Sequence, residues 1–164
     1  MLSYFPAIYP DELLYSVIAR LHVHLGAPPW LSLLEELFGR RMTVADPDLP
    51  GALSRLAEQI SPQRGLTVAR LVDELTPFPY YTAFQSPRIW AWAHRRLCQG
   101  RVADLHLRLG LVAFRSCCVK RLRFCPCCLK DMEAMHGEYY WRRDHQLPGV
   151  LVCPRHGVPL FRSR

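Results

Sequence analysis

Apolar side chains recur at helical spacing along the first hundred residues, and they predict a succession of short helices. The first helix is expected from about Asp11 to Leu25, where leucine and isoleucine residues repeat every three or four positions and Gly26 ends the pattern. A second helix is expected over 29–38, directly after the turn Gly26-Ala27-Pro28. Two helices joined by so short a turn form a helix-turn-helix-like corner.

Four further helices are predicted by the same pattern between proline and glycine boundaries: 52–60, 67–75, a helix opened by Ser86-Pro87, and 103–114. Serine followed by proline is a strong helix start, because serine caps the helix and proline fits its first position. By contrast, Pro77 and Pro79 predict that 76–81 is a fixed aromatic turn and no regular helix.

From residue 120 onward the pattern changes to short apolar pieces. Segments 122–124, 150–152 and 158–161 suit short strands, whereas 129–136 and 139–145 suit short helical segments. We therefore predict a mainly α protein. A helical domain over 1–119 carries the helix-turn-helix-like corner, and a small zinc-ribbon-like module with short strands follows over 120–164.

Two pairs of metal-ligating residues lie in this second part: Cys125 with Cys128, and Cys153 with His156. The two residues inside each pair let both side chains converge on one ion from a tight turn. Two such pairs supply the four ligands of a tetrahedral zinc ion. Four protein ligands leave no position for water or substrate, so we predict one structural zinc ion. About 45 residues bury too little apolar surface to fold without it.

Other cysteine and histidine side chains compete for the same role. Cys127 lies inside the first pair, but it does not give the two-residue gap, so we treat it as a bystander. Cys117, Cys118, His136 and His145 are spare ligands in principle, although no second paired spacing supports another site. The sequence leaves the role of Cys127, Cys117 and Cys118 open.

Several classes of protein are disfavoured by composition and motifs. The N-terminus lacks the pattern of a signal peptide, and charged residues interrupt each long apolar run, so neither export nor a membrane span is expected. Seven cysteines without an export signal point to a reducing compartment. The sequence has no glycine-rich phosphate loop, nucleophile elbow, paired carboxylates or deaminase motif, so we do not expect an enzyme.

The net charge of +7 is unevenly distributed. Residues 1–82 hold six Lys/Arg against nine Asp/Glu, whereas residues 83–164 hold fifteen against five. A basic half favours contact with nucleic-acid phosphates, and an acidic half is freer to meet protein. The alternative is that the arginine side chains only keep exposed helix faces in contact with solvent and bind no partner. Candidate phosphate contacts are Arg95, Arg96, Arg121, Arg123, Arg142 and Arg143, of which Arg142 and Arg143 have a rival role in pairing with Asp144 or Glu138.

The helix-turn-helix-like corner has two possible roles. It could read DNA with its second helix in a groove, as in a sequence-specific regulator. That helix, however, carries Glu35 and Glu36, and Arg40 and Arg41 follow only after its end. Carboxylates facing phosphate are unfavourable. We therefore favour a packing or protein-docking role and keep the DNA reader as the alternative.

With these residues in view, the chain resembles the TniQ/TnsD family, the target-selection proteins of heteromeric transposons. The resemblance covers most of the chain, and its combination of metal pairs with the Trp-Arg-Arg-Asp and Leu-Pro segments is quite specific. It is carried by residues 5–16, 18–20, Phe78-Pro79-Tyr80-Tyr81, Phe124-Cys125-Pro126 with Cys128, 137–144, Leu147-Pro148 and 153–157.

The resemblance implies a non-enzymatic adaptor of the bacterial cytoplasm. Such proteins recognise an insertion site and recruit an AAA+ ATPase that brings in the transposase. Some bind DNA themselves, and others bind to a CRISPR guide-RNA complex that recognises the target. The family's zinc ligands map onto Cys125, Cys128, Cys153 and His156. TnsD-like members continue well beyond this module, whereas this sequence ends eight residues after His156. A short adaptor and the N-terminal portion of a larger protein therefore both remain open.

Overall fold

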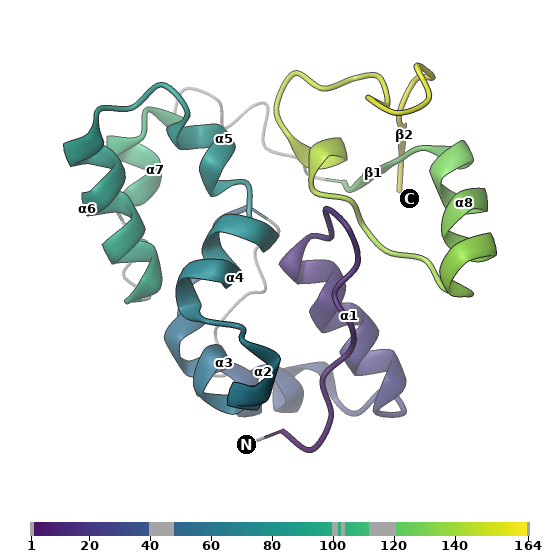
Figure 1. Cartoon of the computed structure of the whole chain (residues 1–164), viewed down its shortest axis with the longest axis horizontal. Coiled ribbons are helices and arrows are strands. Elements are labelled where there is room, and N and C mark those ends of the chain that lie inside the picture. The colour runs from purple at the N-terminus through teal and green to yellow at the C-terminus, as the bar shows by residue number, and fades with distance from the viewer. Residues whose placement is uncertain (1, 40–47, 100–101, 103, 112–120, 164) are drawn as a thin grey trace.

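The computed structural model of the chain describes residues 2–39, 48–99, 102, 104–111 and 121–163. Its described part is mainly helical, as predicted, with a two-stranded antiparallel sheet near the C-terminus (Figure 1). The elements in chain order are α1 (Leu14–His24), α2 (Trp30–Phe38), α3 (Leu53–Gln59), η1 (Pro62–Arg64), α4 (Val68–Leu75), α5 (Phe78–Thr82), α6 (Pro87–Cys98), α7 (Leu105–Arg108), β1 (Arg123–Phe124), α8 (Pro126–His136), η3 (Asp144–Gln146) and β2 (Phe161–Arg162).

One apolar core joins the helices that precede β1. Its buried side chains come from α1, α2, α3, α4, α6 and α7, and Phe78 of α5 joins them. Two of these helices begin at a side-chain cap: Thr67 accepts a hydrogen bond from the backbone N–H of Arg70, and Ser86, the cap expected from the sequence, accepts one from Ile89. Of the described helices, including the twelve-residue α6, none has the length and apolar character needed to cross a membrane.

The predicted corner is formed by α1 and α2. The chain turns between them at Gly26 and Ala27, whose φ angles are 79° and 54°. Helix α2 directs four apolar side chains into the core, Leu33, Leu34, Leu37 and Phe38, and therefore leaves Glu35 and Glu36 on its exposed side. This exposed face carries negative charge, which is unfavourable beside DNA phosphates and suits a packing or protein-docking role.

Two predictions in the helical part need correction. Residues 78–82 form the short helix α5, although 76–81 was expected to be a non-helical turn. Proline is tolerated there because Pro79 lies in the first turn, where backbone N–H groups have no partner inside the helix. The helix expected over 103–114 is shorter, since α7 ends at Arg108 and Gly110 has a φ of 73°. Residues 103 and 112–114 lie outside the described part.

The C-terminal part has short strands, as expected, but they are shorter than the predicted segments. Strands β1 and β2 pair with Arg123 opposite Arg162 and Phe124 opposite Phe161, and an isolated bridge joins Val152 to Pro159. Helix α8 begins at residue 126, three residues earlier than predicted.

The segment 139–145, predicted to be helical, is instead extended around Arg142. This residue forms a bridge with Glu12 of the N-terminal segment, by which we mean the residues that precede α1. Its backbone hydrogen bonds go to that segment, and a helix could not make them. Only the η3 turn at its end, residues 144–146, is helical.

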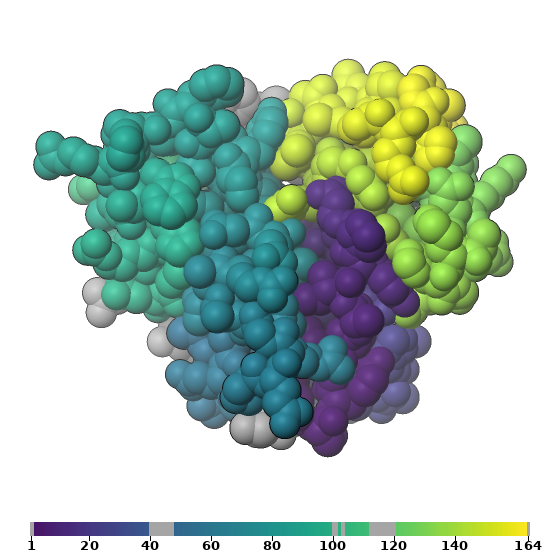
Figure 2. Space-filling model, viewed as in Figure 1, coloured from purple at the N-terminus to yellow at the C-terminus, as the bar shows by residue number. Residues whose placement is uncertain are grey.

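The N-terminal segment lies between the helical part and the C-terminal part (Figure 2). The backbone N–H of Leu13 donates to the carbonyl of Trp141 at 2.9 Å, and the N–H of Arg143 donates to the carbonyl of Asp11 at 2.8 Å. The N–H of Trp141 also donates to the Ser16 hydroxyl at 2.9 Å. Residues 11–16 therefore connect the two parts through backbone hydrogen bonds. The boundary expected between 119 and 120 falls outside the described residues, and the division into two domains stays a prediction.

A buried ion pair lies at this junction. Glu12 is fully buried and Arg20 is 6% exposed, and the Arg20 guanidinium lies 2.9 Å from the Glu12 carboxylate. Arg20 also donates to Glu138, of the C-terminal part, at 2.5 Å. The hydrogen bond from Arg20 holds the pKa of Glu138 at about 2, below the ordinary value of a glutamate. Burial raises the pKa of Glu12, while donors from the Tyr9 backbone, Arg20 and Ser16 oppose that rise.

Replacing Arg20 tests the importance of this junction. In Arg20→Ala, Glu12 would remain buried without its cation, and loss of one partner of a buried pair costs about 3–5 kcal/mol. We expect the free energy of unfolding in urea to fall by about that amount. The control is Arg55→Ala, which removes an exposed pair with Glu58 and should cost less than about 1 kcal/mol. Equal losses in the two variants would contradict the proposed role of Arg20.

Candidate metal centre

The four predicted ligands come from the start of one helix and from one turn. Cys125 is the N-cap residue of α8 and Cys128 lies in its first turn, so the helix geometry directs both side chains to the same side. Cys153 and His156 lie in a turn closed by the N–H of Gly157, which donates to the carbonyl of Cys153 at 2.9 Å. The φ of Gly157 is 66°, a conformation that favours glycine. The expected tight turn is therefore present in the second pair, whereas the first pair begins a helix.

The structure brings these four residues together. Their ligand atoms all lie within 4.8 Å of one another, and the three cysteines are buried. The sulfurs of Cys128 and Cys153 are 3.6 Å apart. Nδ1 of His156 lies 3.6, 3.4 and 3.6 Å from the sulfurs of Cys125, Cys128 and Cys153. Three sulfur atoms and one imidazole nitrogen thus surround a common point, and the cluster could bind a metal ion.

The electrostatics of the cluster also favour a cation. Burial raises the pKa of the Cys128 thiol, and the neighbouring sulfurs of Cys153 and Cys125 raise it further. Burial opposes ionisation of Cys153 as well, but backbone N–H groups of His156 and Arg155 bring the pKa of its thiol to about 7. Several thiolates at this spacing repel one another, so a bound cation would stabilise their ionised forms.

The spare ligands considered from the sequence lie elsewhere or beyond the described residues. Cys127 is half-buried and does not belong to the four-residue cluster. His136 stacks on the Tyr9 ring, with 4.0 Å between ring centroids. His145 is buried, and its Nε2 lies 3.9 Å from the Cys128 sulfur, just outside the group. Cys117 and Cys118 fall within 112–120, which the structure does not describe.

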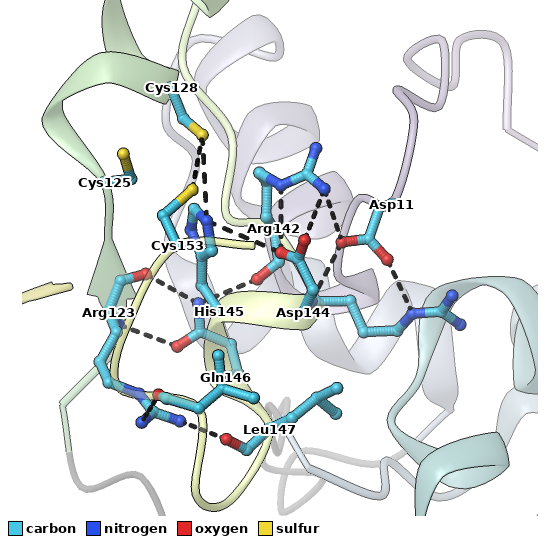
Figure 3. A network of polar contacts seen from close by, with 12 residues as sticks. Asp11, Arg123, Cys125, Cys128, Arg142, Asp144, His145, Gln146, Leu147 and Cys153 are labelled. Carbon is cyan, nitrogen blue, oxygen red and sulfur yellow. Dashed lines mark hydrogen bonds and ion pairs between the residues drawn. The ribbon is translucent and has the colours of Figure 1, made fainter. Parts of the chain in front are cut away.

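The buried side chains of Gln146 and Arg123 hold the backbone in place around the centre (Figure 3). Gln146 accepts from the backbone N–H of Arg123 and donates to the Arg123 and Arg142 carbonyls, with all three distances between 2.8 and 2.9 Å. The Arg123 guanidinium donates to the carbonyls of Leu147 and Val150. These bonds hold β1 beside the loop that leads to Cys153.

A second polar group connects the centre to the N-terminal segment (Figure 3). His145 Nε2 lies between the Cys128 sulfur and the Asp144 carboxylate, which is 3.7 Å away. Arg142 binds both oxygens of Asp144, at 3.0 and 2.6 Å, and lies 3.3 Å from Asp11. Asp11 has a φ of 58°, which is uncommon outside glycine, and its side chain accepts from the N–H of Asp144 at 3.0 Å. The strained turn at Asp11 is thus held by residues next to the centre.

The six candidate phosphate contacts have different surroundings. Arg123 and Arg142 are buried and bonded internally, and Arg143 donates to Asp11 and to the carbonyls of Asp73 and Thr76. Arg95 and Arg121 are exposed, and Arg96 lies 2.8 Å from Asp104. The phosphate role stays a prediction for all six. It is costly for Arg123 and Arg142, because exposing them would break buried hydrogen bonds.

Sequence reasoning missed the residues that support the centre. It included Glu12 and Arg20 in the segments that carry the family resemblance but gave them no role, it did not single out Gln146, and it considered His145 only as a ligand. Each of them is buried and polar in the structure. Polar residues of these types are usually exposed, and nothing in their spacing predicts burial, so the only signal was that Glu12 and Arg20 lie within the segments that carry the family resemblance.

Comparison with known proteins identifies the family of this chain. The family model described as TniQ matches residues 3–160. The chain is 36% identical over 160 residues to the transposon Tn7 transposition protein TnsD of Escherichia coli. The alignment covers 98% of this chain and 32% of that relative, so the chain spans about a third of the relative's length. The match includes the N-terminal segment, the helical part and all four residues of the metal cluster, and the chain belongs to the TniQ family.

Proposed function

We propose that this chain is a non-enzymatic adaptor for target selection in DNA transposition. It would link target DNA, or a complex already bound to the target, to an AAA+ ATPase regulator. The observation that carries the proposal is the similarity to TnsD, a transposition protein, over 98% of this chain. A CRISPR guide-RNA complex is one form that the target-bound complex could take. The closed four-residue cluster supports a structural role for the metal and offers no position for a reacting group.

Zinc is the ion that fits the cluster best. A tetrahedral zinc ion has zinc–sulfur distances of about 2.3 Å and zinc–nitrogen distances of about 2.0 Å, so its sulfurs lie about 3.8 Å apart and its sulfur–nitrogen pairs about 3.5 Å apart. The sulfurs of Cys128 and Cys153 are 3.6 Å apart, the sulfur–nitrogen distances are 3.4 to 3.6 Å, and all four ligand atoms lie within 4.8 Å of one another. Thiolate and imidazole are also the ligand types that structural zinc prefers.

Elemental analysis tests the proposed ion. We expect about one zinc ion per purified chain, little or none in Cys153→Ser, and full occupancy in Cys127→Ser, which changes a cysteine outside the cluster. Because zinc binding contributes folding free energy, hydrogen exchange in Cys153→Ser should increase first within residues 121–163. A wild-type chain without zinc, or equal loss in the two variants, would refute the site.

Helix α6 carries the most suitable surface for nucleic acid among the described residues. Arg88, Trp92 and Arg95 are spaced by four and three positions, so they lie on one side of the helix. Arg88 and Arg95 are exposed. The guanidinium carbons of Arg96 and Arg108 lie 5.6 and 4.7 Å from the Trp92 ring centroid. The result is a cationic and aromatic face of the kind that contacts phosphates.

Salt-dependent DNA binding tests the phosphate contacts. Arg95→Ala with Arg121→Ala should weaken binding to duplex DNA, and the slope of log affinity against log salt should become shallower by about 2, about one counterion per contact. The control is Arg55→Ala with Arg70→Ala, which changes two exposed arginines that pair with Glu58 and Glu74. Identical slopes would exclude Arg95 and Arg121. A strong preference for one sequence that survives high salt would favour the alternative of a sequence-specific regulator.

The acidic helical part is the proposed contact for the ATPase. Helix α2 presents Leu31, which is 61% exposed, and Glu36 of the same helix is exposed as well. Exposed apolar and acidic side chains on one helix are compatible with a protein contact that has a polar rim.

A pull-down from the source cell, with the recovered proteins examined for an AAA+ ATPase, tests that contact. Leu31→Asp combined with Glu36→Lys should reduce the recovered ATPase at least severalfold, because it replaces both the apolar and the acidic contact. Glu58→Lys, an exposed charge reversal on α3, is the control. Unchanged recovery in the first variant would exclude the α2 face, and no recovery with the wild type would contradict the ATPase link.

A further inference from the structure

The His156 ring has a different partner on each of its two nitrogens. Nδ1 faces the three sulfurs of the cluster at 3.4 to 3.6 Å. Nε2, on the opposite side of the ring, lies 3.2 Å from the Asp131 carboxylate. A neutral imidazole carries one proton, so the nitrogen that binds a metal must be the unprotonated one. A carboxylate at Nε2 favours the proton there and leaves Nδ1 free to bind.

We propose that Asp131 is a positioning residue of the metal centre, which holds His156 as an Nδ1 ligand. The inference rests on the proposed zinc site. The Asp131 carboxylate, 3.2 Å from Nε2, would favour a proton on that nitrogen, and it would thereby select the tautomer and the orientation of the ring and increase the electron density on Nδ1. Metal-binding histidines commonly depend on such a partner, and its loss typically weakens metal affinity by about 10- to 100-fold.

The position of Asp131 in α8 explains how it reaches His156. Asp131 follows Cys128 by three residues, so the two side chains are neighbours on one side of the helix. Helix α8 therefore supplies a ligand directly through Cys128 and orients another, His156, through Asp131. The two ligand pairs, which are separated by 24 residues in the sequence, are tied together by this contact as well as by the metal.

The surroundings of Asp131 set the size of the expected effect. Its side chain is 38% exposed, and the Arg155 guanidinium lies 3.8 Å from the same carboxylate oxygen. Water and Arg155 both compete with His156 for the carboxylate, which weakens the contact. We therefore expect a loss near the lower end of the range, about 10-fold in zinc affinity.

Competition with a chromophoric chelator measures this loss in the full chain. Asp131→Ala should bind zinc about 10-fold more weakly than the wild type, and Asp131→Asn should recover part of the loss because its amide oxygen still accepts the Nε2–H. Glu133→Ala removes the same charge from the same helix at an exposed position and should bind as the wild type does. The absorption bands of the cobalt-substituted protein should change in Asp131→Ala and remain unchanged in Glu133→Ala.

A measurement on the wild type tests the tautomer without depending on the folding of a variant. In the zinc-loaded protein, long-range proton–nitrogen correlation should show His156 with a protonated Nε2 and a metal-bound Nδ1. Zinc bound through Nε2, or equal affinities of Asp131→Ala, Glu133→Ala and the wild type, would overturn the role of Asp131 and leave the zinc site intact. Failure of the wild type to bind zinc would refute the site itself.

Discussion

The arrangement of the two parts depends on the burial of one carboxylate. Glu12 has no exposed surface, and a buried carboxylate without a cation would be strongly unfavourable. Arg20 must therefore stay beside it, and the same guanidinium also binds Glu138. The N-terminal segment, α1 and the chain after α8 are fixed relative to one another by these contacts. Because the Arg20 guanidinium is paired with both carboxylates, the junction is specific as well as closely packed.

The metal centre lies at the other end of the same polar framework. Contacts run from Cys128 through His145 and Asp144 to Asp11, which belongs to the N-terminal segment. A structural ion in such a place would stabilise more than its own four ligands, since it would fix the loops that carry Gln146 and Arg142. The centre therefore suits the adaptor role proposed above, in which the surfaces of the protein must keep a constant relation to one another.

Net charge proved to be an incomplete guide to the interaction surface. The basic half of the chain contains fifteen Lys/Arg residues, but several of them are part of the interior. Arg123 and Arg142 are buried, and Arg143 holds the Asp11 turn. Guanidinium groups with five N–H donors are well suited to bind backbone carbonyls and carboxylates inside a protein. Exposed arginines such as Arg95 remain candidates for the proposed phosphate contacts, and the identity of a residue alone does not separate the two uses.

The sequence by itself determined the local features of this protein. Helical spacing of apolar residues predicted α1, α2, α4 and α6, and the paired spacings identified Cys125, Cys128, Cys153 and His156, because both signals are local to the chain. Only the tertiary structure decided what depends on distant partners. It made the chain extended around Arg142 through pairing with 11–13, buried Glu12 against Arg20, and placed Asp131 beside His156. Such contacts join residues far apart in the sequence, and burial and charge pairing between them leave no periodic pattern in the chain.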